Sequence, residues 1–352
     1  MVQSSGSVLM GGQRMETVTE EVAAPEGRQV LIRTHAVGLC GSDLALYQGT
    51  YEGPKNYPIY FGHEWSGTVT AIGSDVTRLR PGDKVTGDCS IFCGQCEWCA
   101  RDQNLCKHIE KFGITVDGAS RQYFLQEERY VYRAAPQADL DLVALSEPLA
   151  VGAHAVRRVR EARPELQQEK ILVFGGGAIG LSCFFALKHI EGCRHVELFD
   201  RVEGRTRKAR TLGASELTDV CAQRSWTDAE AGDSESYGGM YSGRGYDAIF
   251  ETTAAPSAFN RAVDLVRPLG TVMALGFIPK VEVGLKQITM KAARVMGSMG
   301  GTGDFDRVLA FIAQRPDAAR EIISHRLPYT DCRQAFETAM DRQNAMKVLV
   351  HF

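Results

Sequence analysis

The sequence predicts a two-domain α/β protein, in which an irregular β-rich domain accompanies a doubly wound parallel sheet. Three observations predict this class: strand-like runs punctuated by Gly and Pro in the first part of the chain, strands that alternate with helical patterns from about residue 169, and a glycine motif between the first of those strands and its helix. A chain of 352 residues is long enough for about two domains that each bury a core.

The composition is that of an ordinary globular protein, with 44% hydrophobic residues, 24% charged residues and a net charge of -3. This balance gives no reason to expect a nucleic acid or an anionic membrane as partner. The first ten residues lack the basic and apolar segments of a signal peptide, and no run of about 18 apolar residues occurs. We therefore expect a cytoplasmic protein that binds neither nucleic acid nor membrane.

The β-rich part is recognised by apolar runs between turn signals. Residues 30–37 read VLIRTHAV, and Gly/Pro signals follow at Gly49, Gly53-Pro54 and Pro58. After residue 294 the chain returns to short mixed elements, and it ends in the apolar run 346–351. We expect that last run to form an edge strand.

The parallel sheet is predicted over about 151–294. Short apolar runs at 170–174, 195–200, 246–251 and 271–276 are typical of buried strands, and helical patterns follow the first two of them. The helix predicted at 205–212 ends before Gly213. The Gly-, Ser- and acid-rich stretch 228–245 is predicted to be a surface loop within this domain.

Gly175-x-Gly177-x-x-Gly180 follows an apolar strand and opens a helix, which is the context that a dinucleotide-binding turn requires. Asp200 ends the next strand, where a carboxylate accepts hydrogen bonds from ribose hydroxyls and repels a 2′-phosphate. NAD is therefore favoured over NADP, although Arg201 and Arg205 are able to hold a phosphate. The alternative is a structural turn with an aspartate at the end of a strand.

Five of the ten cysteines lie between Cys89 and Cys106, and the segment 91–106 reads IFCGQCEWCARDQNLC. The x2 spacing in a long chain favours a metal site over a disulfide framework. Elsewhere, Cys40 lies in GLCGSD, His63 in GHEWSG and Glu147 in SEPLAVG. Each of these three residues alone has an ordinary structural explanation, such as a buried thiol, a hydrogen-bonded histidine or a turn.

Taken together, these motifs resemble those of the zinc-dependent medium-chain dehydrogenase/reductase superfamily, and the resemblance covers essentially the whole chain. The motifs occur in the family's order, which is GLCGSD, GHE, the clustered cysteines and GGGAIG. The resemblance implies a GroES-like catalytic domain formed by 1–150 and 295–352, with a structural zinc lobe at 89–106. It also implies a Rossmann NAD-binding domain at 151–294. Relatives form dimers and tetramers, so we expect a homodimer or homotetramer.

The same resemblance implies two zinc ions per chain. The catalytic zinc is expected at Cys40 and His63, with Glu64 as a ligand or a neighbouring carboxylate, and with Glu147 at the metal as in the sorbitol dehydrogenase branch. The expected structural zinc ligands are Cys93, Cys96, Cys99 and Cys106. The expected cofactor contacts, besides the three glycines of the motif, are Ile179, Asp200, Arg205, Thr252, Leu275 and Gly276.

Ligand chemistry separates the two zinc sites. Four thiolates close a tetrahedral zinc, whereas Cys, His and Glu ligands leave one position open for a substrate oxygen, on which the metal acts as a Lewis acid. Ser42 matches the family's proton-relay hydroxyl, but Ala45 stands where many relatives carry a relay histidine. We expect the cofactor ribose, Tyr47 or water to complete the proton relay in place of that histidine.

The implied reaction is oxidation of a secondary hydroxyl to a ketone, with hydride transfer to the nicotinamide. Residues 40–49 and 57–67 resemble the 2-deoxy-scyllo-inosamine dehydrogenases of aminoglycoside biosynthesis, which favours an aminocyclitol; sorbitol- and threonine-type substrates remain alternatives. Ser42, Tyr47, Glu64 and Glu147 are the expected polar groups of the pocket.

Two other readings compete with a zinc dehydrogenase. One is a zinc-free quinone or enoyl reductase of the same superfamily, against which Cys40 and His63 argue. The other is a non-catalytic, zinc-stabilised protein that binds NAD or senses redox state. A separate question concerns the cysteine lobe, where only six residues separate Cys99 from Cys106. We expect an intact four-cysteine site; the alternative is that Cys89 replaces Cys106.

Overall fold

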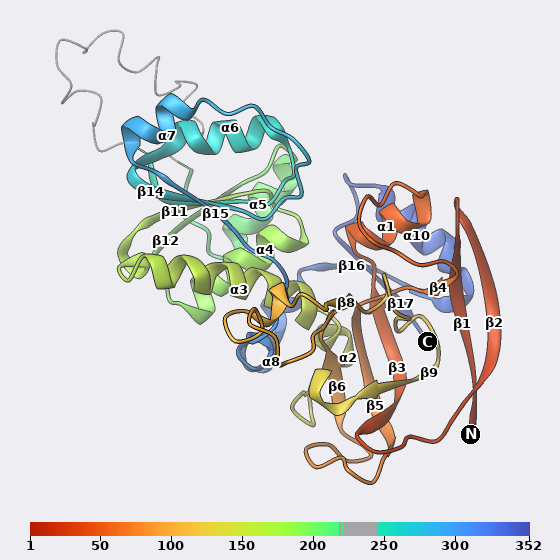
Figure 1. Ribbon diagram of the computed structural model, residues 1–352. Helices are drawn as coiled ribbons and strands as arrows, with labels where there is room; N and C mark the ends of the chain where they lie inside the picture. Colours follow the sequence, from red (N-terminus) through yellow and green to blue (C-terminus); the bar gives the residue numbers. More distant parts are fainter. Residues whose placement is uncertain (218–219, 221–244) are drawn as a thin grey trace, which may run out of the picture. The chain divides into compact units, whose positions relative to one another are not determined.

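The protein is described by a computed structural model that covers residues 1–217, 220 and 245–352. The chain forms two compact units, one made of Met1–Ala150 with Gly300–Phe352 and the other of Val151–Met299 (Figure 1). The loop predicted at 228–245 lies, apart from its last residue, outside the described residues. Among those that are described, no helix combines the length and apolar character needed to cross a membrane.

The main sheet of the first unit has the strand order β10-β6-β5-β3-β17-β16, and β9 also pairs with β3. The predicted strand 30–37 is β3. The expectation of an edge strand at the end of the chain is wrong, because β17 lies between β3 and β16 and is hydrogen-bonded on both sides. The strands are β3 (Gln29–Gly38), β5 (Glu64–Ile72), β6 (Lys84–Gly87), β9 (Tyr123–Glu127), β10 (Val131–Arg133), β16 (Ile323–Pro328) and β17 (Lys347–His351).

Smaller sheets and helices surround this sheet. The aromatic centre of the core includes Trp65, whose ring lies edge-on to Phe124 at 5.0 Å, and Phe336, which packs against Tyr47 at 4.9 Å. The remaining elements are β1 (Val2–Gly11), β2 (Arg14–Val22), β4 (Ile59–Tyr60), β7 (Ser90–Ile91), β8 (Glu110–Lys111), α1 (Gly41–Gln48), α2 (Leu140–Val143), α8 (Phe305–Gln314), α9 (Pro316–Arg320) and α10 (Cys332–Met340).

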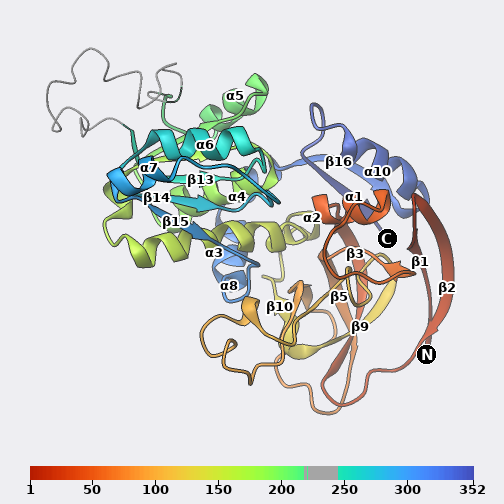
Figure 2. The same cartoon turned by 45° about the horizontal axis from the view of Figure 1, so that its top comes forward.

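The second unit is built on a five-stranded parallel sheet in the order β12-β11-β13-β14-β15. Helices α6 and α7 cover one face of this sheet and α3 lies along the other (Figures 1 and 2). Covered faces explain the continuous apolar runs, and β13 is buried at every position. The elements are α3 (Ser146–Ala162), which begins in the first unit, β11 (Lys170–Phe174), α4 (Ala178–Phe185), β12 (His195–Phe199), α5 (Glu203–Thr211), β13 (Tyr246–Glu251), α6 (Pro256–Leu265), β14 (Val266–Ala274), α7 (Leu285–Lys291) and β15 (Arg294–Gly297).

The predicted elements of this unit correspond closely to the observed ones. The predicted helix 205–212 is α5, and Gly213 follows it with a φ of 96°. The sheet contains one strand that the sequence did not indicate, β15, which starts at the predicted domain limit of residue 294. The α/β class, with a sheet domain and a doubly wound parallel domain, is confirmed.

Candidate active site

Three potential metal ligands meet between α1 and β5 in the first unit. Cys40 is the residue before α1, His63 precedes β5, and Glu64 is the first residue of β5. One ligand atom from each lies within 4.8 Å of the others. His63 and Glu64 are buried, whereas Cys40 is only partly buried.

His63 belongs to a second group of potential ligands as well. Its ring, the thiol of Cys89 and the carboxylate of Glu147 also offer ligand atoms within 4.8 Å of one another, and all three residues are buried. Glu147 reaches this place from the first turn of α3, and Cys89 from the connection between β6 and β7. A mixed set of sulfur, nitrogen and oxygen donors fits zinc. The structure therefore places Cys40 and Glu64 with His63 in one group, and Cys89 and Glu147 with His63 in the other, so that the four predicted residues and Cys89 all lie near His63.

The sequence alone leaves open which group of ligands Cys89 belongs to. Its Sγ donates to the carbonyl of Phe112 at 3.9 Å, and burial raises its thiol pKa to about 12 in spite of the nearby His63. Cys89 stands beside His63 and Glu147 rather than within the group of Cys93, Cys96, Cys99 and Cys106. The alternative in which Cys89 replaces Cys106 therefore finds no support in the geometry.

A buried aspartate organises the backbone of this site. Asp43 accepts hydrogen bonds from the Cys40 N–H at 2.8 Å and the Gly62 N–H at 3.3 Å, and its Oδ1 lies 3.7 Å from Nδ1 of His63. Complete burial raises the pKa of Asp43, while His63 and the Cys40 N–H oppose that rise. Asp43 thus fixes the segments that carry two ligands, as outer carboxylates do at metal sites.

Glu64 is held by a lysine from the far end of the chain. Nζ of Lys347 lies 2.5 and 2.7 Å from the two carboxylate oxygens of Glu64 and donates to the Leu39 carbonyl at 3.1 Å. The exposed fractions of the Lys347 and Glu64 side chains are 4% and 1%. Burial acts to lower the pKa of Lys347, but the charge and hydrogen bond of Glu64, together with Cys40 and Glu147, outweigh it, so that the pKa is raised and the ammonium form is stabilised.

The carboxyl group of Glu147 has a strongly perturbed proton affinity. Burial raises its pKa to about 7, His63 counteracts this, and the neighbouring carboxylates of Glu64 and Asp88 add to the rise. Concentrated negative charge in a buried place favours a bound cation. The electrostatics of Glu147 therefore agree with the donor set around His63.

The polar groups beside these ligands differ in part from those predicted. Ser42 Oγ lies 3.4 Å from Nε2 of His63, whereas Tyr47 is 4% exposed and belongs to the apolar core with Phe336. Tyr51, which the sequence did not single out, is half-buried near the ligands. Burial raises the pKa of Tyr51, and the next contributions come from Cys89, which raises it, and His63, which lowers it. No motif marks Tyr51, so only the tertiary structure reveals its position.

The four predicted lobe cysteines form a closed group of sulfurs. The Sγ–Sγ distances are 3.5 Å for Cys96–Cys99, 3.6 Å for Cys93–Cys106, and 3.9 Å for both Cys93–Cys99 and Cys96–Cys106. Four sulfurs that are each about 2.3 Å from a central zinc lie about 3.8 Å apart. The backbone N–H groups of Cys93 and His108 both donate to Sγ of Cys106 at 3.3 Å. The six-residue gap thus brings Cys106 to the other three sulfurs.

The glycine motif of the second unit forms the turn between β11 and α4. Gly175 has a φ of 102°, and a Cβ on Gly180 would lie 1.8 Å from the Gly175 carbonyl oxygen. Asp200, after β12, accepts hydrogen bonds from the N–H groups of Gly176 at 2.7 Å and Val202 at 2.8 Å. Nη1 of Arg205 lies 3.5 Å from the same carboxylate. Asp200 therefore orders the glycine turn itself.

The other expected cofactor residues lie at the carboxyl ends of neighbouring strands. Thr252 follows β13, and its hydroxyl donates to the Phe174 carbonyl at 2.7 Å. Leu275 and Gly276 follow β14, and their N–H groups donate to the Glu251 carbonyl at 2.9 and 3.1 Å. Ile179 lies in the first turn of α4. This edge of a doubly wound sheet is where dinucleotides bind, at the point where strand order reverses.

Comparisons with known proteins agree with this arrangement. Residues 26–136 match the family described as alcohol dehydrogenase GroES-like domain, and residues 178–314 match the family described as zinc-binding dehydrogenase. The chain is 28% identical to D-arabitol-phosphate dehydrogenase of Enterococcus avium over 94% of this chain and 92% of the relative. It is 29% identical to sorbitol dehydrogenase of Bombyx mori over 100% of this chain and 99% of the relative.

Solved structures extend the similarity to the complete fold. A putative zinc-binding dehydrogenase from Sinorhizobium meliloti 1021, solved bound to NADP, superimposes with a TM-score of 0.85 at 27% identity and covers 100% of both chains. The fold and the ligand groups define a zinc-type, NAD(P)-linked alcohol or polyol dehydrogenase. The chain belongs to the zinc-dependent medium-chain dehydrogenase/reductase superfamily.

Proposed function

We propose that the protein oxidises a secondary hydroxyl of a polyol or aminocyclitol to a ketone, with NAD as the hydride acceptor. The observation that carries this proposal is the shared position of His63 in two groups of potential ligands with mixed donors, of which all but Cys40 are buried. A closed thiolate site has no room for substrate, whereas a Cys, His and Glu set leaves a position open. The partly exposed Cys40 provides the side from which a substrate approaches.

In this proposal Cys40, His63 and Glu147 hold the catalytic zinc, and Cys89 stands as a further thiol beside them. The chemistry that zinc supplies when bound is Lewis acidity toward the oxygen of the substrate hydroxyl. Lys347 contacts both oxygens of Glu64. This contact favours a role for Glu64 as a carboxylate next to the zinc ligands rather than as a zinc ligand itself. Asp43 keeps the Cys40 and Gly62 backbones in place.

Proton removal is assigned to Ser42, with Tyr51 as the second hydroxyl at the site. Ser42 Oγ is 3.4 Å from Nε2 of His63, which supports a position for Ser42 beside the expected site of the substrate hydroxyl. Ala45 supplies no proton acceptor, and Tyr47 lies in the core. We expect Ser42→Ala to lower turnover at neutral pH, and Tyr51→Phe to do so to a smaller degree. An unchanged pH–rate profile in Ser42→Ala would rule out its relay role.

The preference for NAD rests on Asp200 and its partner. Asp200 brings a carboxylate to the glycine turn, where it disfavours a 2′-phosphate, and Arg205 is already paired with that carboxylate at 3.5 Å. The related S. meliloti dehydrogenase is described as bound to NADP, which makes NADP the alternative to test. Replacing Asp200 by Ala should raise the KM for NAD and narrow the difference in kcat/KM between NAD and NADP.

The substrate class is proposed from the site and the relatives together. D-arabitol-phosphate and sorbitol dehydrogenases are among the relatives, which supports a polyol. An L-threonine 3-dehydrogenase is 27% identical over 94% of this chain, so an amino alcohol is a further candidate. Within this class an aminocyclitol is the specific proposal, because residues 40–49 and 57–67 resemble the 2-deoxy-scyllo-inosamine dehydrogenases.

The test is a panel of linear polyols, cyclitols, aminocyclitols and threonine, followed by the appearance of NADH or NADPH absorbance. The proposal expects the highest kcat/KM with a cyclic polyol or aminocyclitol and NAD. If sorbitol or threonine gave the highest kcat/KM, that compound would replace the aminocyclitol as the proposed substrate. No reduction of either cofactor by any alcohol, in a protein that carries its zinc, would favour a non-catalytic NAD-binding protein.

The metal count and the assembly belong to the same proposal. We propose a second, structural zinc at Cys93, Cys96, Cys99 and Cys106, in a homodimer or homotetramer located in the cytoplasm. Elemental analysis should give two zinc ions per chain, and light scattering should give a dimer or tetramer. A count near one with full activity would contradict the structural zinc.

A further inference from the structure

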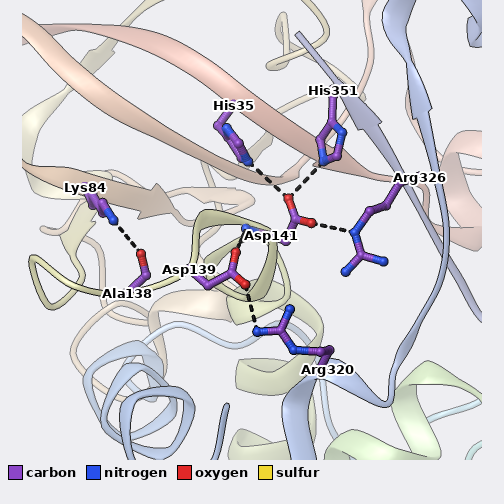
Figure 3. Close-up of polar contacts among 8 residues, drawn as sticks. All are labelled: His35, Lys84, Ala138, Asp139, Asp141, Arg320, Arg326 and His351. Atoms are coloured by element: carbon purple, nitrogen blue, oxygen red, sulfur yellow. Dashed lines mark hydrogen bonds and ion pairs between the residues drawn. The ribbon is translucent and has the colours of Figure 1, made fainter. Parts of the chain in front are cut away.

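A cluster of two histidines and one aspartate lies in the first unit and has no role in the reaction described above. His35 comes from β3, Asp141 from α2 and His351 from β17 (Figure 3). Nε2 of His35 lies 3.1 Å, and Nε2 of His351 lies 2.9 Å, from the same Oδ1 of Asp141. The two rings are 5.3 Å apart between centroids, and one ligand atom of each residue lies within 4.8 Å of the others.

A β-bulge aims His35 at this point. On β3, Thr34 pairs with Gly67 and Ala36 pairs with Ser66, so His35 is an extra residue without a partner on β5. His351 pairs with Ala36 on the other side of β3. In a regular strand His35 would face away from Ala36 and from its cross-strand partner, because side chains alternate. A bulge redirects a side chain and is common next to functional sites.

The distances in the cluster match those between ligands of one metal ion. Imidazole nitrogens and carboxylate oxygens bind zinc at about 2.0–2.2 Å, which places neighbouring ligand atoms about 2.8–3.1 Å apart around a six-coordinate ion whose adjacent ligands lie at about 90°. The observed separations of 2.9 and 3.1 Å lie in this range. Each imidazole would then bind through Nε2 and carry its proton on Nδ1.

The surroundings both orient and expose the cluster. Nε of Arg326 donates to Oδ2 of Asp141 at 2.6 Å, which leaves Oδ1 to the histidines. The N–H of Asp141 donates to Asp139, whose carboxylate also accepts from Arg320 at 2.9 Å (Figure 3). The side chains of His35 and His351 are 42% and 33% exposed, so an ion reaches them from solvent, whereas Asp141 is 13% exposed.

We propose that His35, Asp141 and His351 form a binding site for a divalent transition-metal ion, separate from the ligands around His63 and from the four cysteines. Two imidazoles and one carboxylate suit zinc, nickel or copper, and exposed histidines leave the remaining positions to water. Arg326 fixes the free oxygen of the ligating carboxylate, as outer partners do at metal sites. The ion would join α2 to β3 and β17.

The experiment uses the purified full-length holoprotein, treated with a weak chelating resin that removes loosely held metal. Equilibrium dialysis against zinc, with elemental analysis, gives the number of ions per chain and the affinity of the added one. The variants are His351→Asn and His35→Asn, which keep polar side chains at partly exposed positions. His195→Asn is the matched control, because His195 is exposed at the start of β12 and belongs to none of the ligand groups among the described residues.

The proposal expects one additional zinc in the wild type and in His195→Asn, and loss of that zinc in both cluster variants. Arg326→Gln should weaken the additional zinc by about 10-fold or more, without removing it. Copper bound at the same site should show superhyperfine coupling to two nitrogens, and His351→Asn should remove one of them. Equal zinc uptake in all variants, or no additional zinc in the wild type, would show that the cluster is only a hydrogen-bonded contact and overturn the proposal.

The cluster shares no residue with the ligands around His63. Failure of the proposed metal site is therefore distinguishable from failure of the proposed dehydrogenase reaction. Dehydrogenase activity in the resin-treated protein reports on the proposed function alone. Zinc uptake during dialysis reports on the cluster alone.

Discussion

Replacing Lys347 by Met should destabilise the protein strongly, because Glu64 would remain as a buried anion without its partner. The ammonium group contacts both carboxylate oxygens at 2.5 and 2.7 Å, and both side chains are almost completely buried. Removing one partner of a buried pair costs about 3–5 kcal/mol, since the remaining charge keeps its full desolvation penalty. The hydrogen bond from Lys347 to the Leu39 carbonyl is lost as well, which adds about 0.5–3 kcal/mol.

A double substitution separates loss of the charge pair from loss of packing. In Glu64→Gln/Lys347→Met neither position of the pair carries a charge, so we expect most of the lost stability to return. The control is Lys84→Met: Nζ of Lys84 donates to the Ala138 carbonyl at 2.6 Å (Figure 3), and a single hydrogen bond of this kind contributes about 0.5–3 kcal/mol. Both lysines lie in the first unit, and each substitution removes one side-chain ammonium group.

The measurement is equilibrium unfolding in urea, followed by tryptophan fluorescence, to which Trp65 contributes together with Trp98 and Trp226. Trp65 is completely buried on β5, directly after Glu64, and reports on the unfolding of this unit. We expect the midpoint to fall much further in Lys347→Met than in Lys84→Met, and to recover in the double variant. Equal losses in the two single variants, or no recovery in the double variant, would refute the view that an unpaired Glu64 charge dominates.

Further predictions concern the ligands and the pH dependence. Asp43→Asn should lower the affinity of the proposed catalytic zinc by about 10–100-fold, measured by competition with a chromophoric chelator, since Asp43 positions Cys40 and faces His63; an unchanged affinity would contradict this. Cys106→Ser should remove the proposed structural zinc and lower the melting temperature, and the matched control Cys183→Ser, a buried thiol outside the ligand groups of the described residues, should keep both proposed zinc ions. Burial raises the pKa of Tyr60 from 10.0 to about 12. Its phenol thus ionises later in the folded state than in the unfolded state, and its contribution to stability, fully present below pH 10, is lost between about pH 10 and 12. Tyr60→Phe should unfold with a shallower loss of stability over that window, and an identical alkaline profile would exclude Tyr60 as the cause.

The sequence by itself was sufficient for features that depend on neighbouring residues. The strand runs, the helix that stops before Gly213, and the turn at Gly175 follow from periodicity and from positions that admit only glycine. The cysteine lobe could also be predicted, because closely spaced cysteines reach one another within a single segment. The six-residue gap looked unusual, yet the Sγ atoms of Cys93 and Cys106 lie 3.6 Å apart.

The tertiary structure decided what depends on contacts between distant segments. The pairing of Lys347 with Glu64, the place of Cys89 beside His63, and the approach of Tyr51 to the ligands each join residues whose local sequences carry no common signal. The sequence predicts an edge position for the C-terminal strand because strand periodicity does not report neighbours, whereas β17 pairs with β3 on one side and with β16 on the other. Likewise, the bulge that turns His35 toward Asp141 arises from strand register, which is set only when β3 and β5 pair.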